Sequence, residues 1–203
     1  GFDFPFGQPR KLIDNLKWDP DWESYVNQLS RLCMKDWERL LKEYRTPRDK
    51  GDKQHLRETD DRAKSKSPMM MYGVPVGRMF FRGAHKLLES GVSVVPCRPT
   101  ASDRVALEAY PALAARHWIE KRGYKNDKKK KQTQAHRDAR QEIVGGVRSE
   151  AAKYYEIDVV VHDAALQEMV NDATGDTLDG LLCAVQAASA YLKRDDGWGI
   201  PAN

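Results

Sequence analysis

Four carboxylates lie beside apolar segments that we expect to be buried, namely Asp3, Glu108, Asp176 and Asp179. Asp3 lies in a predicted strand end between two phenylalanines, and Glu108 lies in a predicted strand, where the side-chain period of two places it opposite the apolar residues. Asp176 and Asp179 are three residues apart at the start of a predicted helix, so they share one face. A lone buried carboxylate is costly, whereas several around Mg²⁺ or Mn²⁺ are neutralised, so these residues suggest a metal site.

A site of this kind could hydrolyse phosphodiester bonds. One or two bound ions would activate water and stabilise the leaving oxygen. Two of these carboxylates also have a structural explanation, because Asp176 could cap the final helix and Asp3 could finish a turn. For any one of these residues taken alone, the structural explanation is the simpler one.

The elements that would position these residues can be predicted from apolar spacing. Residues 21–44 show the three-four spacing of one helix face. Further helices are expected at residues 76–88, 111–118, 134–155 (interrupted or softened at Gly145–Gly146), 164–170 and 177–192. Short strands are expected at residues 92–95, 104–109 and 158–161. Residues 46–68 and 123–133 carry many charges and few large apolar side chains, so we expect irregular or mobile loops there.

The composition indicates one globular domain with an uneven charge. A chain of 203 residues with 40% hydrophobic residues can form one sizeable core. Residues 121–140 contain nine Lys or Arg and two Asp, a net +7, so the other residues sum to −3 within the overall +4. A basic segment on a slightly acidic body suits a polyanionic partner, although Lys128–Lys131 alone would be explained by a solvated loop.

Several classes of protein are disfavoured by what the sequence lacks. The three cysteines are widely spaced and form no CxxC pair, and the five histidines are isolated, so a zinc site is not expected. The apolar stretches are too short to cross a bilayer, and no signal peptide is recognisable. We therefore expect a protein of the reducing cytoplasm that has no membrane partner.

Four motifs occur in a characteristic order: Asp3-Phe4-Pro5-Phe6-Gly7, Arg57-Glu58-Thr59-Asp60, Glu108-Ala109-Tyr110-Pro111 and the segment DTLDGLLCA at residues 176–184. This series resembles the family named domain of unknown function 429. Its members are predicted nucleases, similar to RNase H-like and Holliday-junction-resolvase-like folds. The resemblance covers nearly the whole chain.

The resemblance implies an α/β fold, with an RNase H-like mixed sheet that carries helices on both faces. Residues 1–203 would form a single domain, with a helical or loop insertion at about residues 14–68. Asp3, Glu108 and Asp179 would be the catalytic carboxylates, and with Asp176 they would hold Mg²⁺ or Mn²⁺. Arg57, Lys128, Lys129 and Lys130 are the candidates for contacts with the phosphates of DNA or RNA.

One departure from the family pattern leaves alternatives open. RNase H-like domains begin with a strand that carries a further catalytic Asp, and no residue before Gly1 supplies it, so we expect a fragment without the N-terminal strands. The leading hypothesis is a metal-dependent nuclease. The alternative is a catalytically inactive nucleic-acid-binding or scaffold domain. Phosphoryl transfer to a small molecule is the third hypothesis, and it is disfavoured because there is no glycine-rich phosphate loop.

Overall fold

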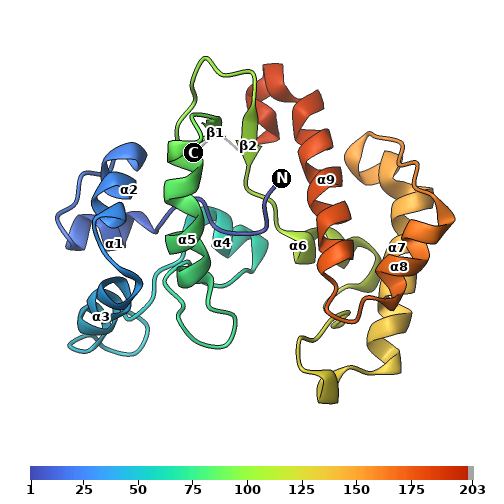
Figure 1. Ribbon diagram of the computed structural model, residues 1–203, viewed down its shortest axis with the longest axis horizontal. Helices are drawn as coiled ribbons and strands as arrows, with labels where there is room; N and C mark the ends of the chain where they lie inside the picture. The colour runs from blue at the N-terminus through green and yellow to red at the C-terminus, as the bar shows by residue number, and fades with distance from the viewer. Residues whose placement is uncertain (201–203) are drawn as a thin grey trace. The chain divides into compact units, whose positions relative to one another are not determined.

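The computed structural model describes residues 1–200, and the chain divides into two compact units. The amino-terminal unit is Phe4–Glu108, and the carboxy-terminal unit combines Gly1–Asp3 with Ala109–Asn203. Both units are mainly helical, and the fold is a mixed α/β arrangement with a small parallel sheet (Figure 1). Within residues 1–200, no helix is both long and apolar enough to cross a membrane.

The amino-terminal unit builds one apolar core from helices and a short sheet. Its helices are α1 (Arg10–Asn15), α2 (Trp22–Ser30), α3 (Met34–Arg45), α4 (Glu58–Ala63) and α5 (Val76–Glu89). Trp37 is fully buried in this core, and its indole nitrogen donates a hydrogen bond to the carbonyl of Gly77 at 3.1 Å. α5 agrees with the helix predicted at residues 76–88, and Gly91 follows it with φ +67°, as a C-terminal stop requires.

Two short strands form the sheet of this unit. β1 (Ser93–Val95) pairs in parallel with β2 (Val105–Leu107), in a register that places Val94 beside Ala106. Both strands were expected from the sequence. The mixed α/β class is therefore confirmed, whereas the larger RNase H-like sheet stays a prediction.

The single helix predicted over residues 21–44 is wrong, because α2 and α3 are separate helices. α2 is capped by the Asp21 carboxylate, which accepts a hydrogen bond from the backbone of Ser24. α3 starts anew at Cys33, whose backbone nitrogen donates to the Asp36 carboxylate at 3.3 Å. The apolar spacing continues across this break, so periodicity alone could not reveal it.

The segment at residues 46–68 is not a loop throughout, as the sequence had suggested. It contains α4, in which Asp60 is buried, and it is anchored by His55, which is also buried. The His55 ring shares a hydrogen bond of 2.7 Å with the Tyr44 hydroxyl. Polar side chains inside the fold hold this segment, and a pattern based on apolar residues does not detect such contacts.

The carboxy-terminal unit is a helical assembly with its own core. It contains α6 (Pro111–Ile119), the 3₁₀ turn η1 (Lys129–Lys131), α7 (Gln134–Tyr155), α8 (Asp163–Asn171), α9 (Asp176–Leu192) and η2 (Arg194–Gly199). α9 packs against α6, α7 and α8, and Leu178 and Leu182 on it are fully buried. The positions of α6, α7, α8 and α9 agree with the predicted helices.

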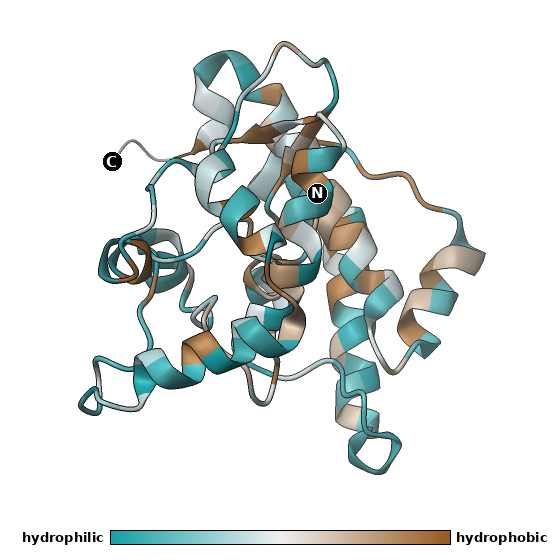
Figure 2. Cartoon of the chain, turned by 60° about the vertical axis from the view of Figure 1, so that its left-hand side comes forward, coloured by the Kyte–Doolittle hydropathy of each residue, from teal (hydrophilic) through white to brown (hydrophobic). Residues whose placement is uncertain are grey.

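Two details of this unit differ from the sequence-based expectation. α7 runs without interruption through Gly145 and Gly146, and Gly146 lies directly against the Trp118 indole, where a side chain would not fit. The strand predicted at residues 158–161 is wrong, because these residues form neither a strand nor a helix. They belong to a connection between α7 and α8 that is largely hydrophobic (Figure 2). Val160 in this connection is 95% exposed. β-Branched residues favour a strand, but a strand also needs a partner.

Candidate functional site

Asp179, the acid of the last predicted helix, is held in the first turn of α9 by the turn before it. The Asp172 carboxylate accepts hydrogen bonds from the backbone and hydroxyl of Thr174 and of Thr177, at 2.5–3.0 Å. Gly175 then adopts φ +77°, a conformation that suits glycine. This arrangement fixes the start of α9 and directs Asp179 into the unit.

The carboxylate of Asp179 is buried and both of its oxygens are engaged. Its side chain is 8% exposed. Oδ1 accepts a hydrogen bond from the Tyr124 hydroxyl at 2.7 Å, and Oδ2 pairs with the Lys125 ammonium. A buried charge needs such partners, because the low dielectric of the interior penalises an isolated ion.

Lys125 is the cation of a small cluster of carboxylates. Its aliphatic chain packs against Gly175, where a Cβ atom would approach it to 2.8 Å. Burial alone would lower the pKa of Lys125, but the hydrogen bond to Asp179 and the negative charges of Asp179, Asp3 and Asp176 raise it. The structure therefore brings three of the four predicted acids within electrostatic reach of one ammonium group.

Burial shapes the acid-base properties of this cluster. It raises the pKa of Asp179, and the ion pair with Lys125 and the hydrogen bond from Tyr124 offset part of that rise. Burial also raises the pKa of Cys183 to about 11, helped by the charges of Asp3 and Asp179. Cys183 is consequently a neutral thiol near pH 7, and it does not add a negative charge to the cluster.

The chemistry of the donor set can be compared with the needs of a divalent cation. Mg²⁺ and Mn²⁺ take oxygen ligands, which Asp3, Asp176 and Asp179 possess. Among residues 1–200, however, no three His, Cys, Asp or Glu side chains are grouped closely enough to hold a metal ion. With Lys125 bound to Asp179, these residues do not fit a metal site as they stand.

Glu108 belongs to the amino-terminal unit, where it pairs with Arg57. The Arg57 guanidinium donates to both Glu108 oxygens, at 2.6 and 2.7 Å, and also to Asp60. The backbone nitrogen of Phe6 donates to Glu108 at 2.8 Å. Burial alone would lower the pKa of Arg57, but the hydrogen bonds to Asp60 and Glu108 raise it. Arg57 thus fixes the Glu108 carboxylate, and its predicted contact with substrate phosphate stays a prediction.

The predicted basic segment separates into structural and exposed cations. Arg140 is buried and donates hydrogen bonds to the carbonyls of Tyr124 and Val170, at 2.7 and 2.9 Å, so it supports the backbone beside the cluster. Arg122 pairs with Glu142. Lys128, Lys129 and Lys130 are exposed, and none of them forms an ion pair with any residue from 1 to 200.

Sequence reasoning missed Tyr124 and Lys125, the two residues that hold Asp179. Both lie in the segment that was expected to be a solvated loop, and their partner lies more than fifty positions away along the chain. The available signal was Tyr124 itself, since a large aromatic residue in a run of lysines is an anchor for a loop. Arg140 was missed for a similar reason, because it was counted only as part of a basic run.

The two units together define a mixed α/β protein, mostly helical, with a carboxylate cluster at the start of its last long helix. The family described as "Protein of unknown function (DUF429)" matches residues 1–203, and the chain belongs to this family. No curated protein and no solved structure matches the chain significantly.

Proposed function

We propose that the chain belongs to an RNase H-like hydrolase that cleaves phosphodiester bonds of nucleic acid with the help of Mg²⁺ or Mn²⁺. The observation that supports this proposal best is the grouping of Asp3, Asp176 and Asp179 around the Lys125 ammonium. A buried carboxylate whose pKa is shifted by burial and by a specific ion pair, as that of Asp179 is, is a candidate for a functional site. Cys33, Cys97 and Cys183 are free thiols, which suits the cytoplasmic location that we propose.

The proposal requires Lys125 to leave Asp179 before a metal ion can bind. The ammonium now occupies the position at which a cation would neutralise this buried carboxylate. Metal binding would therefore compete with the ion pair. Glu108 belongs to the other unit, and its role as a catalytic carboxylate stays a prediction.

A cleavage assay with matched variants tests the proposal. The wild type would be incubated with labelled single-stranded and double-stranded DNA and RNA, in Mg²⁺, in Mn²⁺ and in EDTA. We expect metal-dependent cleavage that Asp179→Asn abolishes. Asp158→Asn is the control, because Asp158 is exposed and outside the cluster, and it should cleave like the wild type. Absence of cleavage of every substrate in both metals would refute the proposal.

A second candidate function is nucleic-acid binding without catalysis. It is favoured by the same ion pair, because Lys125 already neutralises Asp179, and by the exposed cations Lys128, Lys129 and Lys130. Binding of duplex DNA should then weaken with salt, and replacing the three lysines by Gln should reduce the slope of log K against log salt by about 0.9 for each lost phosphate contact. The control replaces the exposed residues Lys35, Lys66 and Lys86, which should leave the slope unchanged.

A further inference from the structure

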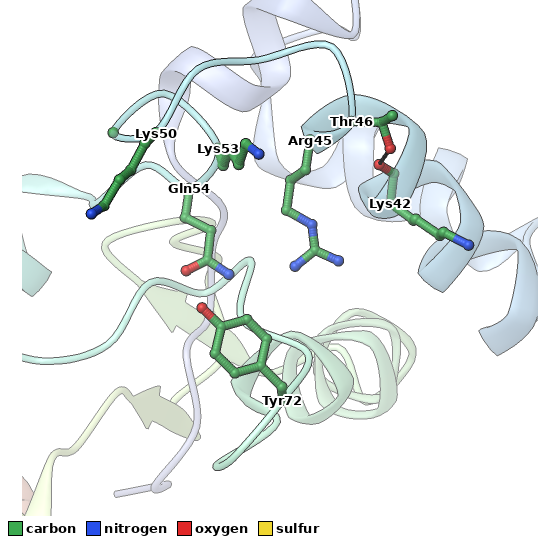
Figure 3. A pocket seen from close by; sticks show the side chains of 8 residues that line it. Lys42, Arg45, Thr46, Lys50, Lys53, Gln54 and Tyr72 are labelled. Atoms are coloured by element: carbon green, nitrogen blue, oxygen red, sulfur yellow. Dashed lines mark hydrogen bonds between the residues drawn. The ribbon is translucent and has the colours of Figure 1, made fainter.

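A pocket of about 570 Å³ lies in the amino-terminal unit, and its lining contains none of the residues that we assign to the candidate functional site. The end of α3 contributes Lys42, Arg45 and Thr46; the segment after it contributes Lys50, Gly51, Lys53 and Gln54; and the segment before α5 contributes Tyr72 (Figure 3). The volume is that of a pocket for a small molecule.

The lining of this pocket is positively charged and uncompensated. It contains four cations and no carboxylate. Within residues 1–200, none of the four cations forms an ion pair. Asp52 lies in the same segment, but its carboxylate is bound by Lys11 at 2.6 Å and by Arg48 at 2.8 Å, neither of which lines the pocket. Asp49 also lies in this segment, but neither Asp49 nor Asp52 lines the pocket, so the lining itself carries only positive charge.

The side chains give the pocket two chemically distinct sides. Arg45, Lys53 and Gln54 lie toward its interior, while the ends of Lys42 and Lys50 are directed away from it (Figure 3). The amide nitrogen of Gln54 is buried and finds no acceptor within the described residues. Across from them lies the ring of Tyr72, which is 64% exposed. One side thus offers donors and positive charge, and the other offers an aromatic face.

The position of two cations at the end of α3 has a structural explanation that does not extend to the others. Lys42 and Arg45 lie in the last turn of the helix, where positive charge favours the helix dipole. Lys50 and Lys53 lie beyond the helix and have no such reason to approach it. Like charges that line one pocket without an acid in the lining repel one another unless an anion joins them.

We propose that this pocket binds a nucleoside phosphate, with the phosphate on Arg45 and Lys53 and the base stacked on Tyr72. A guanidinium matches phosphate oxygens with paired hydrogen bonds, and a lysine adds a point charge. A base stacks on an aromatic ring through its π face. This assignment goes beyond the proposed function, because it uses none of the carboxylates of the cluster and lies within one unit.

Calorimetric titration of the full chain with ADP, pyrophosphate and adenosine tests the proposal. We expect saturable binding of ADP that is stronger than that of pyrophosphate, and the weakest binding for adenosine. Arg45→Gln with Lys53→Gln should weaken ADP binding about tenfold or more, since each contact is a charge-assisted hydrogen bond. Tyr72→Ala should weaken ADP binding and leave pyrophosphate binding unchanged.

The matched control is Arg31→Gln with Lys35→Gln, which removes the same charge from exposed positions outside the pocket. It should bind ADP like the wild type. Lys53→Gln alone should also weaken ADP binding. Because Lys53 is exposed, this substitution should not disturb folding. Asp179→Asn should also keep full ADP binding, so that failure of the nuclease proposal and failure of this proposal can be told apart.

Three results would overturn the assignment. The first is the absence of saturable ADP binding to the wild type, including the case in which only a single-stranded oligonucleotide binds. The second is ADP binding that the pocket variant and the control variant weaken equally. The third is ADP binding that Tyr72→Ala leaves unchanged, since the base would then not lie on this ring.

Discussion

The ion pair between Lys125 and Asp179 joins side chains that are 54 positions apart, and it determines how the carboxylate cluster behaves. Asp179 is buried with both oxygens engaged, so its charge is matched inside the protein rather than by solvent. A divalent cation and the Lys125 ammonium would compete for the same oxygens. Lys125 is therefore the residue at which a metal-binding role and a structural role for Asp179 can be separated.

Lys125→Ala should change stability and metal affinity in opposite directions. We expect the free energy of unfolding without metal to fall by about 1–2 kcal/mol, less than for a fully buried pair, because the Lys125 side chain is 35% exposed. Mn²⁺ should bind more tightly than to the wild type, since its competitor is gone. Thermal melts with and without Mn²⁺ measure both effects. A variant that melts lower without any gain in the metal-induced shift would show that the pair is purely structural.

The residues also show what a sequence can and cannot reveal about the site. Asp3, Asp176 and Asp179 could be selected because acids beside apolar segments are unusual. Tyr124 and Lys125 could not, because a charged run is read as a solvated surface and the burial of a lysine depends on a distant partner. The pairing of Arg57 with Glu108 was hidden in the same way.

Among the elements, α9 depends on the turn that precedes it. The hydrogen bonds from Thr174 and Thr177 hold the pKa of Asp172 below its usual value of 3.8, although burial alone would raise it. Because the pKa in the folded state is lowered, the ionised carboxylate stabilises the fold above the usual value. That stabilisation is lost as the pH falls through the lower folded pKa.

Asp172→Ala should therefore destabilise the protein in a pH-dependent way. We expect a loss of about 1–2 kcal/mol at neutral pH, the scale of a lost helix cap, with a smaller difference from the wild type at strongly acidic pH. Urea unfolding over a pH series measures this difference. A loss that stays constant from neutral to acidic pH would mean that the charge of Asp172 contributes nothing.

The two adjacent glycines of α7 provide a matched pair. A Cβ at Gly146 would lie 2.2 Å from the Trp118 ring, whereas a Cβ at Gly145 would meet no atom within 4 Å. Gly146→Ala should cost about 1–3 kcal/mol through overpacking, and Gly145→Ala should stabilise the helix by about 0.5–1 kcal/mol. Chemical denaturation of both variants decides this. Equal effects at the two positions would contradict the packing of α6 against α7.

Apolar spacing located most of the helices, and its failures have a common physical cause. Spacing reports which side chains are buried, and it does not report where backbone hydrogen bonds begin or end. The apolar spacing continues across the break at residues 31–33, where the Asp36 carboxylate caps the first turn of α3. It also missed α4, whose first turn is organised by Arg57 and Asp60 rather than by apolar residues.

At the scale of the whole molecule, each unit has a separate apolar core. The amino-terminal unit is continuous in sequence from Phe4 to Glu108. We expect residues 4–108 expressed alone to fold, because this segment is continuous in sequence and has its own apolar core. A cooperative thermal transition with dispersed amide signals in NMR would confirm this. A spectrum typical of an unfolded chain would show that this core depends on the remaining residues.

The connection between α7 and α8 has a consequence for amide exchange. Within the described residues, the backbone of residues 158–161 forms no hydrogen bond, although Val159 and Val161 partly cover the core of their unit. Exchange of an amide proton for deuterium requires a broken hydrogen bond, so these amides need no opening event. We expect them to exchange within the first seconds of labelling, while the flanking helices retain their protons. Mass spectrometry of peptides measures the exchange. Slow exchange of these amides would show that the segment pairs with another strand in solution.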